Sequence, residues 1–345
     1  MHRYSGFSFS SLLAVLLTGA APAQALTIVD TFGSSITGNA NAAQIEATIQ
    51  SASNAIASLY ANPITVTINY QLTNSGLGGS SQNLYAVSYS AYTQALKNDS
   101  AAHPDNATLA SAVANLSKGN DAGGQTPIAL TSSLVDALGL GNVNAGGTVY
   151  LNSSLMYFGT GPLPSNLYSG TGVTQHEIDE ILGGGGPGSS LGAPYQGAYY
   201  GPLDLYRYSA PGAPSYTSGF PNTAIYFSVN GGATSLVDFN QTGHGDFGDF
   251  YDTTLIQNYA AYPGHNPEAF AGSLESTMLQ SIGYDLVNGS TSSSTGASPL
   301  LNAASKMDPA PAPAPGLGLA SFSFLLTAGA AAKLLESRRC RRATW

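Results

Sequence analysis

The chain has 345 residues, of which 43% are hydrophobic, 10% aromatic and only 8% charged, with a formal net charge of −9. The apolar share is large enough for a folded core, so the composition excludes a disordered chain for the body of the protein. Basic residues are concentrated at the two ends, and the acidic body lacks the basic surface that nucleic-acid binding requires, so we expect no nucleic-acid partner.

The first 25 residues are typical of a secretory signal peptide. His2 and Arg3 precede the apolar run Leu12–Leu17, and Ala23-Gln24-Ala25 is a cleavage site of the small-x-small type. We therefore predict that the protein is exported and that residues 26–287 form its folded domain.

The first half of this domain predicts helices alternating with strands. Asn41–Ala61 places apolar residues at alternating spacings of four and three, which indicates an amphipathic helix. Ile64–Tyr70 alternates with period two, which indicates a half-buried strand. The elements expected next are a short strand at 84–87, helices at 89–97 and 105–117, a loop at 120–124, a helix at 130–138 and a strand at 148–151.

The segment Gly172–Gly183 reads Gly-Val-Thr-Gln-His-Glu-Ile-Asp-Glu-Ile-Leu-Gly and predicts a helix with one chemically active face. His176 and Glu180 are separated by four residues, so their side chains lie on the same face and can bind one metal ion. Glu177 lies beside that position, where it can take a proton from an attacking water. Ile178, Ile181 and Leu182 face the other way, toward the core, in this prediction.

Downstream of this helix, the sequence predicts a hairpin and a closing helix. Ile225–Val229 and Thr234–Phe239 alternate on either side of Asn230-Gly231, a dipeptide that favours a tight turn. Ser273–Tyr284 is the final predicted helix.

The C-terminal residues predict a linker and a membrane-sorting tail. Residues 288–315 are rich first in Ser and Gly and then in Pro and Ala, as in an extended linker. Residues 316–345 contain the apolar stretch Gly316–Ala332 followed by an arginine cluster. This tail resembles the PEP-CTERM type of bacterial sorting signal. The resemblance implies a sorting machinery as partner, a transient membrane anchor that is cut away, and a final location at the cell envelope, at the cell surface or outside the cell.

The ordered motifs of the domain resemble zincin metallopeptidases. His176-Glu177-x-x-Glu180 followed by Leu182-Gly183 is similar to the zincin active helix, with Glu in place of the second His. Together with the later motifs Asp204–Ser209, Tyr226–Gly232, Phe239-Asn240, Gly245–Phe250 and Ile282–Asp285, the series is similar to a group of exported bacterial metalloproteases that often carry such tails. The resemblance implies an α+β, zincin-like metalloprotease domain with a twisted mixed sheet, an active-site helix and a closing C-terminal helix.

The third metal ligand does not follow from the motif. The extended zincin pattern places a His or Asp three residues after the helix-ending glycine, but this chain has Gly186 there. The candidates elsewhere are Asp204, His244, Asp246 and His265. We select Asp204 as the third ligand. The alternative is that Asp204 forms a structural ion pair with Arg207.

Two functions remain open at this level. The first is a zinc-dependent endopeptidase that hydrolyses protein or peptide substrates, with His176, Glu180 and Asp204 as zinc ligands and Glu177 as the catalytic base. The second is a non-catalytic surface or matrix protein on the same scaffold, without metal or with Ca²⁺. The acidic loop that contains Asp238, Asp246, Asp249 and Asp252 offers oxygen ligands for that ion.

Overall fold

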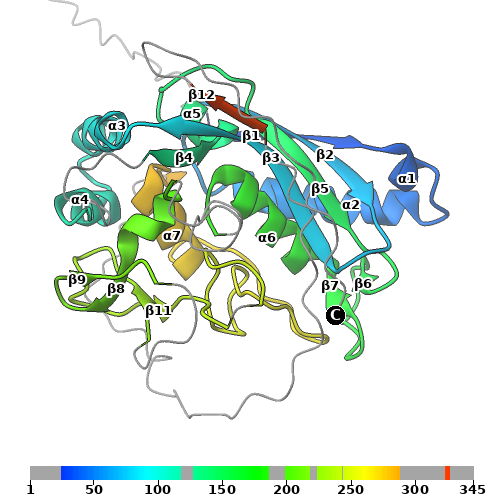
Figure 1. Cartoon of the computed structure of the whole chain (residues 1–345). Helices are drawn as coiled ribbons and strands as arrows, with labels where there is room; N and C mark the ends of the chain where they lie inside the picture. Colours follow the sequence, from blue (N-terminus) through cyan, green and yellow to red (C-terminus); the bar gives the residue numbers. More distant parts are fainter. Residues whose placement is uncertain are drawn as a thin grey trace, which may run out of the picture.

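A mixed β-sheet with two helices, α2 and α6, packed side by side against one face forms the frame of the domain (Figure 1). The computed structural model describes residues 25–117, 127–185, 199–217, 224–242, 244–287 and, for the backbone alone, 323–326. The mixture of helices with parallel and antiparallel strands confirms the predicted α+β class.

The main sheet contains β1 (Thr27–Phe32), β2 (Thr65–Leu72), β3 (Gly78–Val87), β4 (Ile128–Thr131), β5 (Gly146–Leu151) and the short β12 (Ser323–Leu326). Strands β1, β2 and β5 are parallel neighbours in that order, and β3 lies antiparallel to β5. Strand β4 pairs antiparallel with the second half of β3, and β12 pairs in parallel with the same half of β3. This order places β3 directly above the helix that carries the predicted site.

The helices are α1 (Ser34–Thr37), α2 (Ala42–Ala57), α3 (Tyr89–Ala102), α4 (Ala107–Ala114), α5 (Ser132–Ala137), α6 (Gly170–Leu182) and α7 (Leu274–Ile282). The smaller elements are β6 (Met156–Tyr157), β7 (Tyr168–Ser169), the 3-10 helix η2 (Pro202–Tyr206), β8 (Arg207–Ala210), β9 (Ala213–Pro214), β10 (Tyr226–Phe227) and β11 (Val237–Asp238). Strands β8 to β11 form a second, antiparallel sheet.

The core lies between the sheet and its two helices, as the apolar periodicity predicts. Ile45, Ile49 and Ile56 of α2 are buried, because residues three and four apart share one helical face. Val66 and Ile68 of β2 are also buried, because alternate residues of a strand share one face. Each fully buried side chain of this size stabilises the fold by about 1.5–3 kcal/mol relative to an exposed one.

The closing helix α7 is tied to α6 at its C-terminal end. Both helices end at a glycine with positive φ, Gly183 (109°) and Gly283 (116°), a conformation that other residues adopt with strain. The Tyr284 hydroxyl then donates a hydrogen bond of 2.9 Å to the carbonyl of Leu182. The predicted closing helix is therefore confirmed, and it supports the end of α6.

Three local predictions need correction. Strand β3 begins at Gly78 rather than near residue 84, because pairing with β5 extends it through a Gly/Ser-rich segment of low strand propensity. Residues 130–131 of the predicted helix belong to β4, and α5 starts after Thr131, whose hydroxyl accepts a hydrogen bond from Leu134 N. The hairpin pairing of β10 with β11 is present, but residues 228–236 replace the predicted two-residue turn.

The predicted signal peptide, the loop at 120–124 and most of the tail lie outside the described residues. Within the described part of the chain, no helix has the length and apolar character needed to cross a membrane. Of the predicted membrane segment Gly316–Ala332, only the four residues of β12 are described, and they form a strand.

Candidate metal centre

Helix α6 begins and ends at well-defined caps, which fix the direction of its side chains. The Ser169 hydroxyl accepts a hydrogen bond of 2.9 Å from Gly172 N at the N-terminus. At the other end, Gly183 N donates to the carbonyls of Asp179 and Glu180. Ile178, Ile181 and Leu182 are fully buried against the core, as predicted, so the opposite face carries the polar groups.

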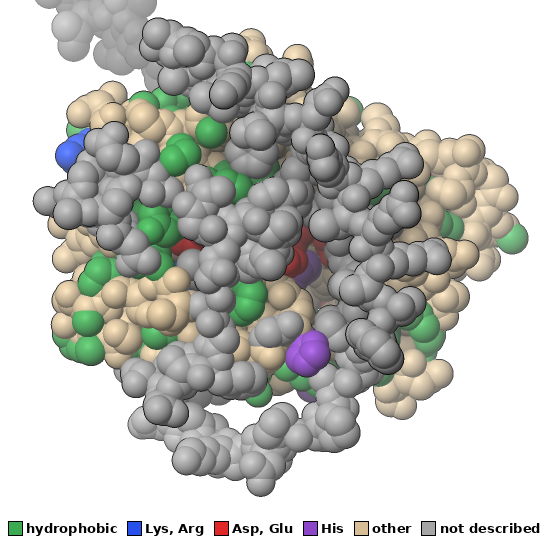
Figure 2. All heavy atoms as spheres, viewed as in Figure 1, with side chains coloured by type: hydrophobic (Ala, Val, Ile, Leu, Met, Phe, Trp, Pro, Cys, Tyr) green, Lys and Arg blue, Asp and Glu red, His purple; other side chains and the backbone are tan. Residues whose placement is uncertain are grey.

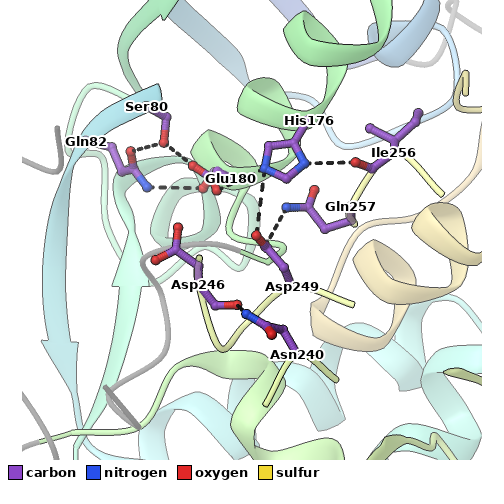
Figure 3. A network of polar contacts seen from close by, with 9 residues as sticks. All are labelled: Ser80, Gln82, His176, Glu180, Asn240, Asp246, Asp249, Ile256 and Gln257. Atoms are coloured by element: carbon purple, nitrogen blue, oxygen red, sulfur yellow. Dashed lines mark hydrogen bonds and ion pairs between the residues drawn. The ribbon is translucent and has the colours of Figure 1, made fainter. Parts of the chain in front are cut away.

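His176, Glu180 and Asp249 bring three ligand atoms to one point (Figure 3). His176 Nε2 lies 3.4 Å from Glu180 Oε1 and 3.9 Å from Asp249 Oδ2. Glu180 and Asp249 are both buried, and the imidazole is largely so. The pairing of His176 with Glu180 is the arrangement that their spacing on one helix predicts.

A further set of side chains holds each of these groups in place. His176 Nδ1 lies 2.8 Å from the carbonyl oxygen of Ile256, to which it can donate, leaving Nε2 for a metal ion. Ser80 of β3 donates a hydrogen bond of 2.5 Å to Glu180 Oε2, and Gln257 donates one of 2.9 Å to Asp249 Oδ1. In Figure 3 these partners converge from β3, α6 and the loop before α7.

The loop that contains Ile256 is itself anchored by α7. Glu275, which is 3% exposed, accepts a hydrogen bond of 2.8 Å from Ile256 N through its Oε1. Because the carbonyl oxygen of Ile256 accepts the hydrogen bond from His176, Glu275 positions the imidazole indirectly, through Ile256. Sequence reasoning missed Ser80, Gln257 and Glu275, because none of them lies near the helix motif in the chain.

Glu177 lies beside the three ligands and lines a cleft of about 120 Å³. Its Oε2 atom is buried and receives no hydrogen bond. The cleft is walled by the start of β3, by α6 and by the loop before α7; its lining includes Leu77, Gly78, Tyr168, Val173, Tyr259 and Tyr262. In Figure 2, acidic and histidine side chains gather near the centre of the face shown. The geometry therefore provides an unpaired carboxylate oxygen next to the ligand group and an adjoining space.

The pKa values of the site reflect crowded acids. Burial raises the pKa of Glu177 well above its usual range, and the nearby carboxylate of Glu180 raises it further. Burial lowers the pKa of His176, but the hydrogen bond to Glu180 and the charges of Asp249 and Glu177 outweigh this, so its pKa is well above the usual value. Asp246 lies close by, and burial and then Asp249 raise its pKa well above normal. Such a concentration of carboxylates is the environment that a bound cation stabilises.

The ligand predicted from sequence, Asp204, lies elsewhere. It belongs to η2, where its Oδ2 accepts a hydrogen bond of 2.8 Å from Gly201 N, and it interacts electrostatically with Arg207. The structure therefore places Asp249, and not Asp204, beside His176 and Glu180. Of the other candidates, Asp246 adjoins the group without joining it, while His244 and His265 are exposed, with His265 on the cleft wall.

Comparison with known proteins adds no identification. No family model, curated protein or solved structure matches this chain. The function must therefore be argued from the site.

The ligand set and its spacing could hold a metal ion. A tetrahedral ion with bonds of about 2.0–2.1 Å separates its ligand atoms by about 3.4 Å. The separations of His176 Nε2 from Glu180 Oε1 (3.4 Å) and from Asp249 Oδ2 (3.9 Å) require little adjustment. An imidazole nitrogen among the donors also favours a transition metal over Ca²⁺, which takes oxygen ligands.

Proposed function

We propose that the protein is a zinc-dependent endopeptidase with a zincin-like domain. The proposal rests on one observation: three convergent ligand atoms from His176, Glu180 and Asp249 lie beside a carboxylate, Glu177, that has an unpaired oxygen and lines a cleft. The arrangement of a mixed sheet over two helices, one of them carrying the site, supports the same proposal.

The chemistry divides among these residues. A zinc ion held by the three ligands would lower the pKa of an attacking water and polarise the carbonyl of a peptide bond. Glu177 would take the proton from that water and pass it to the leaving amine nitrogen. Ser80 and Gln257 would keep the two carboxylate ligands in position, and the Ile256 carbonyl would keep Nε2 of His176 unprotonated.

The cleft supports a peptide as substrate. Its walls are mainly apolar and aromatic, with Leu77, Val173, Tyr168, Tyr259 and Tyr262 around the polar groups. Such walls bury substrate side chains, while the few polar groups orient the scissile bond. With the signal peptide and the sorting tail of the sequence, the proposed site of action is the cell envelope, the cell surface or the medium, and the tail would anchor the chain transiently during sorting.

Substitution of the two glutamates separates the proposed roles. Glu177→Gln preserves the shape and removes the base, so zinc should remain bound while hydrolysis of an unfolded protein falls by about 10²–10⁴-fold. Glu180→Ala should lose the metal as well as the activity. Glu46→Gln, at a partly exposed position of α2 outside the ligand group, provides a control that should match the parent in both assays.

The result that opposes the proposal is equally defined. A parent chain that binds one zinc ion at His176 and cleaves no unfolded protein at any pH would be a non-catalytic surface or matrix protein. A parent that binds no zinc at His176 would exclude the metal centre itself.

A further inference from the structure

A second group of metal-ligand atoms lies away from the cleft. Asp99 belongs to the last turn of α3, His103 follows that helix, and Asp285 follows α7. His103 Nδ1 lies 2.9 Å from Asp99 Oδ1 and 2.8 Å from Asp285 Oδ2. All three ligand atoms lie within 4.8 Å of one another. Segments that lie far apart in the sequence thus bring three donors together.

One of the two carboxylates of this group, Asp99, is only partly satisfied by the protein. Asp285 is nine-tenths buried, with 9% of its side chain exposed, and Asp99 is 16% exposed. Asp99 Oδ2 is buried and receives no hydrogen bond, although its other oxygen contacts His103. A single N–H on Nδ1 of His103 would have to serve both carboxylates, because that nitrogen is close to each. An orphaned buried oxygen of this kind calls for a further partner.

Charge points in the same direction. Asp99 and Asp285 place two largely buried carboxylates on either side of one imidazole nitrogen, so their like charges repel in poorly solvated surroundings. Even a protonated His103 balances only one of the two carboxylates. A divalent cation balances both and leaves the imidazole neutral, as a ligand must be.

We propose that Asp99, His103 and Asp285 form a second zinc site, which joins the end of α3 to the segment after α7. One imidazole and two carboxylates suit zinc, with water as a fourth ligand on the side where His103 is half exposed. The donors need to separate by about 0.5 Å to reach tetrahedral spacing, which the exposed imidazole allows.

The role of this site is structural. Asp285 is bound to the loop between α2 and β2, because Ala61 N donates to its carbonyl oxygen and its own N–H donates to Asn62 Oδ1. Asn106, at the start of α4, donates a hydrogen bond of 2.9 Å to Asp285 Oδ1. An ion at Asp285 therefore fastens α3, α4 and the α2–β2 loop to the segment where the chain leaves the domain. The mature domain has no cysteine to make such a connection by disulfide.

Metal counting on single-site variants of the purified full chain tests this proposal separately from the proposed function. After equilibration with zinc and removal of excess, the parent should hold two ions per chain by elemental analysis. His103→Ala and His176→Ala should each hold one, and the double variant none. Asp285→Asn, which retains a side chain of the same size, should repeat the loss of one ion if His103→Ala folds poorly. Asp105→Asn removes an exposed carboxylate near His103 and should still hold two.

Thermal unfolding provides the second readout. In the His176→Ala background, zinc should raise the Tm through the second site, and His103→Ala should abolish that rise. If His176→Ala holds no zinc and its Tm does not change when zinc is added, the second site does not exist. In that case, one ion bound to His103→Ala would still support the proposed metalloprotease centre. If instead His103→Ala holds none and His176→Ala holds one, the metalloprotease proposal fails and the second site stands.

Discussion

Exchanging two aspartates for asparagine, one at a time, decides which of them binds the proposed catalytic metal. Asp249→Asn keeps an oxygen that can accept the hydrogen bond from Gln257, but it replaces an anionic ligand with a neutral one. Loss of a supporting residue around a metal already costs 10–100-fold in affinity, so loss of a ligand should cost at least about 100-fold, or roughly 2.7 kcal/mol. Stability without metal should be unchanged or slightly higher, because one carboxylate leaves a crowded acidic group.

Asp204→Asn should give the opposite pattern. Arg207 is fully buried, and burial lowers its pKa to about 10 while the charge of Asp204 opposes that shift. Removing a charged partner from a buried ion typically costs about 3–5 kcal/mol. For a domain of this size, that loss corresponds to a Tm lower by on the order of 10 °C. Zinc affinity should not change, since Asp204 does not belong to the ligand group.

Competition against a chromophoric chelator measures the zinc affinity, and thermal unfolding in EDTA measures the metal-free stability. Counting bound ions at the same time separates the cleft site from the site at His103. Zinc loss in Asp204→Asn together with normal affinity in Asp249→Asn would refute the assignment and restore the ligand chosen from the sequence.

Three further outcomes follow from the structure and one from the sequence of the tail. A β-carbon at Gly78 would lie 2.6 Å from Glu177 Oε1, so Gly78→Ala should lower kcat while zinc stays bound; an unchanged kcat would show that the carboxylate moves without cost. Glu275→Ala should weaken zinc binding at the cleft by about 10–100-fold, whereas Glu275→Gln, which keeps the acceptor, should be close to the parent in a zinc titration. Burial raises the pKa of Asp179. Its contribution to stability is therefore complete below its ordinary pKa of about 4 and is lost as the pH rises through the raised value. Asp179→Asn should flatten the dependence of the metal-free urea midpoint on pH, and an unaltered slope would oppose this. The released protein should lack residues 316–345 by intact-mass measurement, and a mass that includes Trp345 would exclude cleavage of the tail.

The part of the site that the sequence predicts is the part set by local geometry. His176, Glu177 and Glu180 lie within one turn of one helix, so the helical repeat alone fixes which of them share a face. The buried positions of α2 and β2 follow from apolar periodicity for the same reason. Spacing in the sequence is sufficient to predict which residues share a face wherever those residues belong to one helix or strand.

The third ligand was not predictable in this way, because it depends on tertiary structure. Asp249 comes from an irregular loop whose path is fixed by contacts among its own residues. For example, Asn240 N donates a hydrogen bond of 2.8 Å to the carbonyl oxygen of Asp249, and the Gln257 side chain donates one to its carboxylate. The motif Gly245–Phe250 is visible in the sequence, where Asp249 is predicted only as an oxygen ligand for calcium. The start of strand β3 was not predictable for a related reason. Its Gly/Ser-rich residues form a strand because they pair with β5, and not because of their own strand propensity.

The distance along the chain between Ser80, His176 and Asp249 has a consequence for how the protein would acquire the proposed metal. An unfolded chain holds these groups far apart, so only the folded domain binds the ion with full affinity. Binding to one state alone shifts the folding equilibrium by RT ln(1 + [L]/Kd), about 2.7 kcal/mol when free zinc is a hundred times Kd. A chain that crosses a membrane unfolded would therefore arrive without zinc, and the zinc concentration outside the cell would set both its activity and its persistence.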